Sequence, residues 1–281
     1  MFKLLKNLIK EPMFVIGSFL LIATVFSGLF GPYIYTAPPT SGAELPFEAP
    51  SAQHWLGLDN IGQDYVALLL KGLQNSLYVG FLAGIIATTM GTLVGLFAGF
   101  KGGIVDDILT MFTNLFIVIP SFVVLVLVSA SWPEGRSLTL IAVLIGLTTW
   151  PWTARSVRAQ ATSIRGRDHI SLARINGASN LQIIFKHILP YLASYVFMVF
   201  IMQVASGILS ESAISMIGLG PIGEGSTSLG VILNTAKNQS AITDGIWWGI
   251  FPAAIVITVI VFALYLLNNS MEGVFNPRLR K

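Results

Sequence analysis

The sequence contains no cysteine and little charge. Only 10% of its 281 residues are Asp, Glu, Lys or Arg, whereas an ordinary soluble domain carries roughly 25%. The absence of cysteine excludes a disulfide framework and any metal site with cysteine ligands. The shortage of charge, combined with 54% hydrophobic residues, argues against a water-soluble fold.

The motifs of several enzyme classes are also missing. There is no GxxxxGK[ST] phosphate loop, so we do not expect this chain to hydrolyse ATP through a Walker-type site. No Ser/His pair or HExxH pattern supports an intramembrane hydrolase. The histidines, His54, His169 and His187, are far apart and lack neighbouring acidic residues at metal-ligand spacing. We therefore predict that the chain is not an enzyme and binds no cofactor or metal itself.

Long uncharged windows are what the sequence does have. A bilayer core about 30 Å thick requires about 20 apolar residues per helix. Six windows of at least 18 residues contain no charged side chain, and their continuous apolar runs differ from the alternating pattern of transmembrane β-strands. We predict an all-α integral membrane protein whose single transmembrane domain covers residues 1–281. The expected spans are 13–34, 76–100, 108–130, 138–155, 189–217 and 247–270.

Lysine and arginine are distributed very unevenly between the predicted connections. Thirteen of the 16 lie at the termini, around 100–107 or between Arg155 and Lys186, and only Lys71, Arg136 and Lys237 lie on the other side. Because basic connections remain in the cytoplasm, both termini and the loop 156–188 are predicted to be cytoplasmic. The net charge of +3 reflects this orientation, and no basic module interleaved with aromatic residues indicates nucleic-acid binding.

The cytoplasmic loop has the pattern of two short amphipathic helices separated by Gly177. Ile170, Ala173 and Ile175 are spaced as the apolar face of the first helix, and a similar pattern follows the glycine. Asp168 puts a carboxylate near the first helix N-terminus, and glycine suits the turn because it tolerates a positive φ. Two small helices that project from a membrane bundle give a partner protein a contact surface through which it can move the bundle.

The outside connections are less regular. The segment 35–74 is rich in proline and small residues, and its later part, 54–73, is a candidate for a short amphipathic helix on the membrane surface. The other large outside connection is 218–244. We expect function to reside in the larger connections.

Several further motifs occur in a fixed order along the chain. They are LGLDNIGQD (56–64), GGIVDD (102–107), IPS (119–121), the loop pattern from 172 to 190, ESAISMIGLG (211–220) and FNPRLR (275–280). Together they resemble the second permease subunit of the ABC importers that carry dipeptides, oligopeptides or nickel, over nearly the whole chain. The family usually has Arg, Glu and Ala where this sequence has Gln63, Asp168 and Leu172.

The resemblance implies a six-helix permease of the type I ABC importer fold in the prokaryotic inner membrane. It implies a homologous second permease subunit, two cytoplasmic ATPase subunits that bind ATP and Mg, an extracytoplasmic substrate-binding protein, and surrounding lipid. The chain would form half of the membrane pathway. The residues expected to dock on an ATPase are Asp168, Ser171, Leu172, Ala173, Gly177, Ala178 and Ser179.

The cargo remains open at this point. The family carries oligopeptides, oligosaccharides and nickel, and the scarcity of histidine argues weakly against nickel. Candidate pathway residues are Gln203, Glu211 and Ser215, because polar groups there interrupt an otherwise apolar span.

Glu211 has two interpretations. As a coupling residue it would indicate an ion-coupled secondary transporter, and as a hydrogen-bonded carboxylate inside the bundle it would be structural. We favour the second, because an isolated carboxylate makes a poor proton relay and no inverted repeat is visible. A noncatalytic membrane scaffold is the remaining alternative.

Overall fold

The computed structural model describes residues 8–37, 47–132, 135–223 and 225–275, and these are helical except for loops and one isolated bridge between Leu58 and Asp64. The predicted all-helical class is confirmed for this part of the chain. Residues 276–280 of the last motif lie outside the described residues, as do residues 38–46 of the first outside segment. Five of the thirteen basic residues assigned to the cytoplasm also lie outside them: Lys3, Lys6, Arg278, Arg280 and Lys281.

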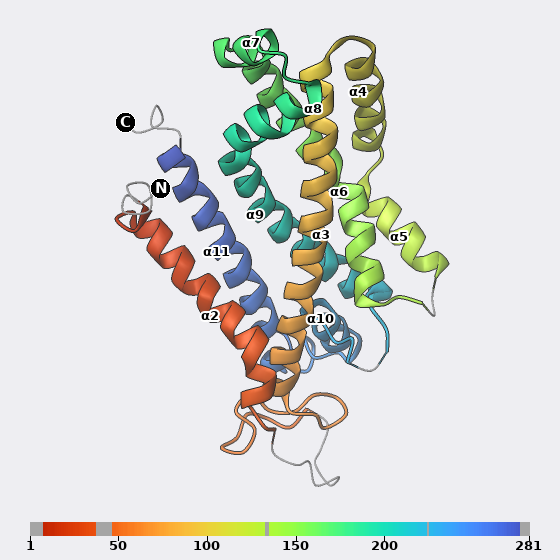
Figure 1. The fold of residues 1–281 in the computed structure, drawn as a ribbon. Coiled ribbons are helices and arrows are strands. Elements are labelled where there is room, and N and C mark those ends of the chain that lie inside the picture. Colours follow the sequence, from red (N-terminus) through yellow and green to blue (C-terminus); the bar gives the residue numbers. More distant parts are fainter. Residues whose placement is uncertain (1–7, 38–46, 133–134, 224, 276–281) are drawn as a thin grey trace.

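Long helices form the body of the molecule, and short ones lie at its ends (Figure 1). The longer helices are α2 (Pro12–Ile34), α3 (Tyr65–Lys101), α4 (Gly103–Val118), α5 (Ser121–Ser131), α6 (Leu138–Arg165), α9 (Leu189–Ile214) and α11 (Phe251–Phe275). The shorter ones are α7 (Asp168–Ile175), α8 (Asn180–Gln182), α10 (Leu229–Asn238), the π-helical segments η1 (Ile183–Ile188) and η2 (Ser215–Leu219), and the 3-10 turn η3 (Trp247–Gly249). Helix α7 lies at one end of the molecule, and α10 lies in the opposite half.

Helix α3 is central and packs against α6, α9 and α2, while α11 packs against α2 and α9. Glycines permit the closest approach. A Cβ atom at Gly95 would lie 2.6 Å from the carbonyl oxygen of Ala154 on α6. A Cβ atom at Gly84 would lie 3.1 Å from the backbone nitrogen of Val204 on α9. Small residues at such crossings let transmembrane helices make extensive van der Waals contact.

Among the described residues, four helical stretches are long and apolar enough to cross a membrane: Pro12–Ile34, Tyr65–Lys101, Asn180–Leu219 and Trp247–Gly273. The pair α4 and α5 supplies a fifth span if the two count as one. Helix α6 is long enough, but the polar run that begins at Thr148 and includes Arg155 reduces its apolar character. The count of six spans therefore stays a prediction.

The predicted span 108–130 does not correspond to one straight helix. The chain bends by 73° between α4 and α5. Ile119 has an extended backbone, with φ −77° and ψ 120°, and Pro120 follows it. Proline disfavours the helical conformation of the residue before it, and this accounts for the break.

Two other local predictions need correction. The second short helix after Gly177 is not separate, because α8 runs through η1 directly into α9. Helix α3 already begins at Tyr65, so the candidate surface helix over 54–73 is instead a loop followed by the start of a long helix. Asp64 caps that helix, since its side chain accepts a hydrogen bond from the backbone nitrogen of Ala67.

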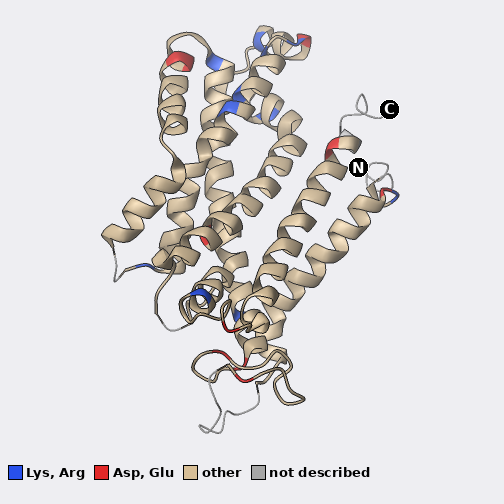
Figure 2. Cartoon of the chain, turned by 180° about the vertical axis from the view of Figure 1, so that it is seen from behind, with Lys and Arg blue, Asp and Glu red and all other residues tan. Residues whose placement is uncertain are grey.

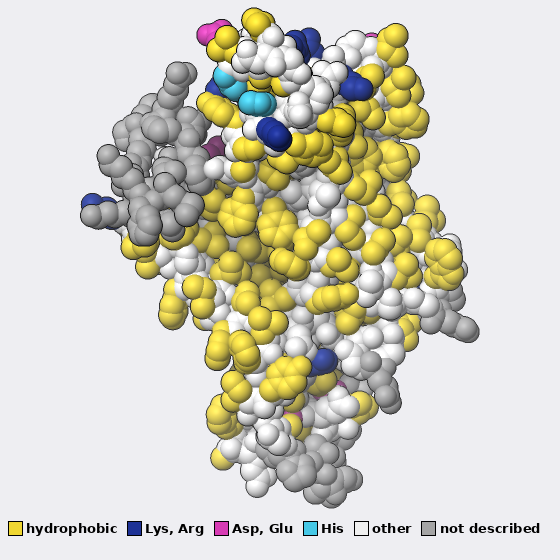
Figure 3. All heavy atoms as spheres, in the orientation of Figure 1, with side chains coloured by type: hydrophobic (Ala, Val, Ile, Leu, Met, Phe, Trp, Pro, Cys, Tyr) yellow, Lys and Arg dark blue, Asp and Glu magenta, His cyan; other side chains and the backbone are white. Residues whose placement is uncertain are grey.

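The ends of the molecule and its sides carry different kinds of side chain. Figure 2 shows most of the described Lys and Arg residues toward the end that carries α7. Figure 3 shows hydrophobic side chains over much of the middle. A broad apolar side surface between polar ends is the pattern expected of a helical bundle in a bilayer.

Candidate functional site: the cytoplasmic loop and the polar cavity

Helix α7 ends in a glycine turn. Gly177 has φ +78° and its backbone nitrogen donates to the carbonyl oxygen of Arg174 at 3.0 Å. The backbone nitrogen of Ala178 donates to the carbonyl oxygen of Ala173 at 3.0 Å, so the last carbonyl groups of the helix are satisfied. The positive φ at this turn requires glycine or a residue such as asparagine that tolerates the left-handed conformation.

The next long helix begins directly after this turn. The Ser179 hydroxyl accepts a hydrogen bond from the backbone nitrogen of Gln182 at 3.3 Å, and the Gln182 side chain accepts one from the backbone nitrogen of Ser179 at 3.0 Å. This reciprocal pair is a capping box. Ser179 therefore starts the continuous helical stretch α8–η1–α9, which connects the α7 turn directly to α9.

One side of α7 is packed against the bundle and the other is exposed. Ile170 is fully buried and Ala173 is 8% exposed, within an apolar cluster that includes Ile184 of η1. Leu172 is 59% exposed and Ile175 is 80% exposed. The sequence pattern predicted Ile175 on the buried face of the helix, but the structure places it on the exposed face.

The seven predicted docking residues are brought together on this short segment. Asp168, Ser171, Leu172, Gly177 and Ser179 are exposed, Ala178 is half-buried and Ala173 is buried. Ala173 can therefore act only by holding α7 in place. Ile175, which is not among the seven, is even more exposed than Leu172.

Arginine side chains fasten the loop to the bundle. The Arg167 guanidinium lies 4.7 Å from the ring centroid of Tyr191 on α9 and also donates to its hydroxyl. The Arg174 guanidinium lies 5.2 Å from the ring centroid of Phe100 on α3. Cation–π contacts of this kind keep the loop in a fixed position relative to both helices.

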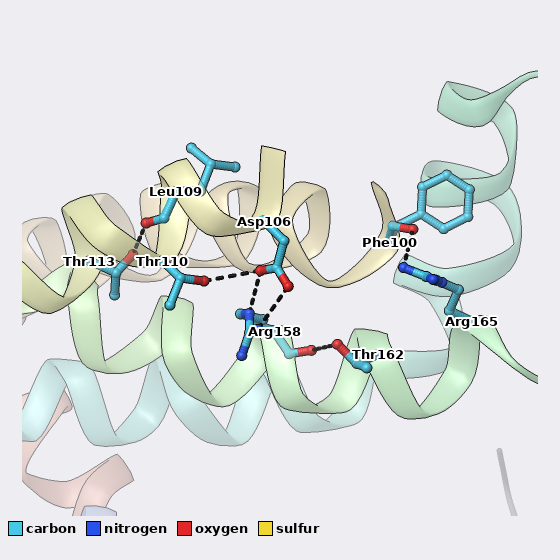
Figure 4. A network of polar contacts seen from close by, with 8 residues as sticks. All are labelled: Phe100, Asp106, Leu109, Thr110, Thr113, Arg158, Thr162 and Arg165. Atoms are coloured by element: carbon cyan, nitrogen blue, oxygen red, sulfur yellow. Dashed lines mark hydrogen bonds and ion pairs between the residues drawn. The ribbon is translucent and has the colours of Figure 1, made fainter. Parts of the chain in front are cut away.

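An ion pair joins α4 to α6 close to the same end (Figure 4). Arg158 donates from Nε to Oδ1 of Asp106 at 2.5 Å and from Nη2 to Oδ2 at 2.8 Å, while Thr110 donates to Oδ1 at 3.0 Å. The hydrogen bonds from Arg158 lower the pKa of Asp106 below its ordinary value. Sequence reasoning noted Asp106 only as part of the 102–107 motif and did not find this partner.

A cavity of about 560 Å³ opens between α5, α6, α9 and α11. Its wall is rich in hydroxyl, amide, aromatic and methionine side chains, and among the described residues Glu272, toward the end of α11, is the one charged side chain that lines it. The Gln203 amide donates to the Thr153 hydroxyl at 2.7 Å, so α9 and α6 are tied together in this wall. Of the three predicted pathway residues, Gln203 alone lines the cavity.

Glu211 and Ser215 are buried and do not line this cavity. Glu211 is fully buried, and its carboxylate accepts hydrogen bonds from Ser76 at 3.0 Å, Ser215 at 2.6 Å and Ser228 at 2.5 Å. The arrangement favours the structural interpretation of Glu211, because the carboxylate is enclosed and satisfied and does not face the cavity. Ser76 and Ser228 were not identified from the sequence, since they lie far from Glu211 along the chain.

A second, apolar cavity of about 910 Å³ lies between α2 and α11 on one side and α3 and α9 on the other. The hollowed yellow surface in the middle of Figure 3 lies in this region. Phe197 and Phe200 of α9 contribute to its wall. Helix α9 therefore presents one face to an apolar space and another to the polar cavity.

Comparison with known proteins identifies extensive similarity. Residues 91–281 match the family model described as "Binding-protein-dependent transport system inner membrane component". The oligopeptide transport system permease protein OppC of Mycobacterium tuberculosis (strain ATCC 25618 / H37Rv) is 31% identical over 253 residues, covering 88% of this chain and 86% of that protein. OppC of Lactococcus lactis subsp. cremoris is 30% identical over 244 residues, covering 87% of this chain and 78% of that protein. The dipeptide transport system permease protein DppC of Bacillus subtilis is 29% identical over 279 residues, covering 99% and 85%.

Proposed function

Because this chain belongs to the family of binding-protein-dependent transport system inner membrane components, we propose that it is one of two permease subunits of an ABC importer for oligopeptides or dipeptides. The chain is a multi-pass inner-membrane transport component. The peptide cargo is supported by the names of the relatives, OppC and DppC. Neither name supports an oligosaccharide cargo or ion-coupled secondary transport.

The proposed assembly contains a second permease, two ATPase subunits that bind ATP and Mg, and an extracytoplasmic substrate-binding protein. In it the end of this chain that carries α7 faces the cytoplasm, as do both termini, and α10 faces the opposite side. The distribution of charge supports this orientation: eight of the thirteen basic residues predicted to be cytoplasmic lie in the described part, against Lys71, Arg136 and Lys237 on the other side. Six spans follow if α6 and the bent pair α4–α5 each cross the membrane once.

The observation that carries the proposal is the connection of α7 to the cavity wall. Exposed Leu172 and Ile175 offer apolar side chains to a cytoplasmic partner, and the anchored face of α7 rests on η1. The stretch α8–η1–α9 then runs without interruption to Gln203 in the polar cavity. Closure of the ATPase pair on ATP would displace α7 and change the position of α9.

The polar cavity is the proposed contribution of this chain to the pathway, and the second permease would provide the facing wall. Hydroxyl and amide groups such as those of Thr153, Gln203 and Asn268 can exchange hydrogen bonds with a peptide backbone. The lack of charge along most of the wall suits peptides whose side chains differ in charge. Glu211 and Ser215 are not part of this proposed lining.

Purification and reconstitution test the function. The chain would be isolated in mild detergent, its partners identified by mass spectrometry, and the complex placed in proteoliposomes with a labelled oligoalanine peptide. We expect a second permease and ATPase subunits to co-purify and uptake to require ATP, Mg and a binding protein. Uptake by the isolated chain without ATP would support the ion-coupled alternative, and partner binding without any uptake would support a scaffold.

A further inference from the structure

Glu211 lies at a junction of three separate parts of the chain. Ser76 belongs to α3, Ser215 begins η2, and Ser228 is the N-cap of α10. All three serines are at most 1% exposed, and each donates its hydroxyl hydrogen to the Glu211 carboxylate. Hydrogen bonds from three segments to one buried side chain must all break before these segments separate, and buried polar groups left without partners are costly, so this junction resists separation.

The serine hydroxyls are fixed from their other side as well. The oxygen of Ser76 accepts a hydrogen bond from the backbone nitrogen of Leu229 at 3.1 Å. The oxygen of Ser228 accepts one from the backbone nitrogen of Val231 at 3.2 Å. Glu211 is thus connected through Ser76 and Ser228 to the first turn of α10.

The contact between α10 and α9 is reinforced at the break that ends α9. Gly218 has φ +86° within η2, and Asn234 and Lys237 of α10 both donate to the carbonyl oxygen of Met216, at 2.8 Å and 3.1 Å. At Gly230 a Cβ atom would lie 2.7 Å from the Cα of Ser212. These contacts leave α10 little freedom to move independently of the end of α9.

Successive residues of α9 face the junction and the cavity. Ser210 lines the polar cavity, and the next residue, Glu211, holds α10. Beyond α10, the turn that contains Ile242 is exposed, with Ile242 67% exposed. A force on α10 is therefore passed to the cavity wall through the hydrogen bond of Ser228 with Glu211 and the adjacent residue Ser210.

On the basis of the proposed importer function, we propose that Glu211 is a positioning residue that makes α10 and α9 one unit, so that docking of the substrate-binding protein on α10 is transmitted to the cavity and onward to α7. The carboxylate does not contact the peptide. Its role is to couple the outside docking event to ATP hydrolysis. This role concerns the stimulated rate and leaves the basal ATPase rate unaffected.

The test uses the complete reconstituted transporter and compares ATPase rates with and without peptide-loaded binding protein. Glu211→Gln keeps the shape but replaces one carboxylate oxygen by an amide nitrogen that cannot accept from Ser76. Ser228→Ala removes the link to α10 and keeps Ser76 and Ser215. We expect both variants to assemble with a wild-type basal ATPase rate. The stimulation of that rate by the loaded binding protein should fall about fivefold, the lower end of typical coupling between sites.

Two matched controls separate this role from general damage. Ser212→Ala removes a buried hydroxyl beside Glu211 that has no hydrogen-bond partner in the described part of the chain. Ser137→Ala removes the N-cap of α6, where Ser137 accepts from Leu140 at 3.1 Å, so it matches the loss of a helix cap in Ser228→Ala. Both controls should retain full stimulation.

The proposal is overturned if stimulation in Glu211→Gln and Ser228→Ala remains within about twofold of wild type. It is also overturned if basal and stimulated rates fall in the same proportion, since that indicates a purely structural role. If Glu211→Gln does not assemble, Ser228→Ala decides between these outcomes. A wild-type complex that no binding protein stimulates would instead overturn the importer function, and this inference with it.

Discussion

Arg158 of α6 holds both carboxylate oxygens of Asp106 of α4, at 2.5 Å and 2.8 Å. The two residues are 52 positions apart, and α4 is the first half of the bent pair α4–α5. Thr110, which lies on the same helix as Asp106, donates a further hydrogen bond to Oδ1 of Asp106. The pair therefore fixes the start of α4 against the helix that leads into the loop with α7.

We expect this pair to contribute on the order of 1 kcal/mol, because the geometry is bidentate but the Arg158 side chain is 39% exposed. Asp106→Asn and Arg158→Gln should each lower the melting temperature of the purified complex. The double variant should be no less stable than the worse single variant. Asp107→Asn, at an exposed neighbouring residue, is the control and should lower the melting temperature less, because Asp107 acts on Arg158 through its charge and makes no hydrogen bond to it in the described part of the chain. Full additivity of the two single effects would show that the side chains do not interact.

The same pair predicts a dependence on pH. Arg158 lowers the pKa of Asp106 below the ordinary 3.8, so the folded protein binds a proton less readily than the unfolded chain. The stabilisation is therefore fully present above 3.8 and is lost as pH falls through the lower, folded pKa. The difference in melting temperature between wild type and Asp106→Asn should be constant from about pH 8 to about pH 5. A difference that already declines across that range would contradict the assignment.

Gly177 should tolerate asparagine but not valine. Its φ of +78° is strained for a β-branched residue by about 1–3 kcal/mol, whereas asparagine adopts this region more readily. A Cβ atom there meets no other atom of the described chain within 4 Å, so within this chain the two variants differ in backbone conformation and not in packing. We expect Gly177→Val to lose ATP-dependent uptake and Gly177→Asn to retain most of it. Equal uptake by both variants would mean that the turn geometry does not matter for coupling.

Gln203 should matter for movement of peptide and not for assembly. Gln203→Leu removes the amide that faces the cavity and leaves the Thr153 hydroxyl without its donor. Loss of such a polar contact costs roughly 1–3 kcal/mol, so we expect peptide uptake to fall by about 5- to 150-fold with normal recovery of the complex. Leu209→Ala, on an exposed part of α9 outside the cavity, provides the control. If the two variants transport peptide equally well, the cavity is not the pathway.

The sequence alone determined the class of this protein. Long uncharged windows and sparse charge identified a helical membrane protein, because hydrocarbon excludes charged side chains and unpaired backbone groups. The collinear motifs identified the permease family, and the similarity to OppC and DppC over most of the chain confirms it. Gly177 was recognisable as a turn because few other residues tolerate a positive φ.

Only the tertiary structure decided which residues meet. It paired Asp106 with Arg158, moved Ile175 to the exposed face of α7, and turned Glu211 away from the cavity that Gln203 lines. Spacing along a helix reports which residues share a face, but not which helix that face will contact. The contacts of Glu211 with Ser76 and Ser228 depend on how α3, α9 and α10 pack together, and that packing is set by long-range complementarity that no local pattern encodes.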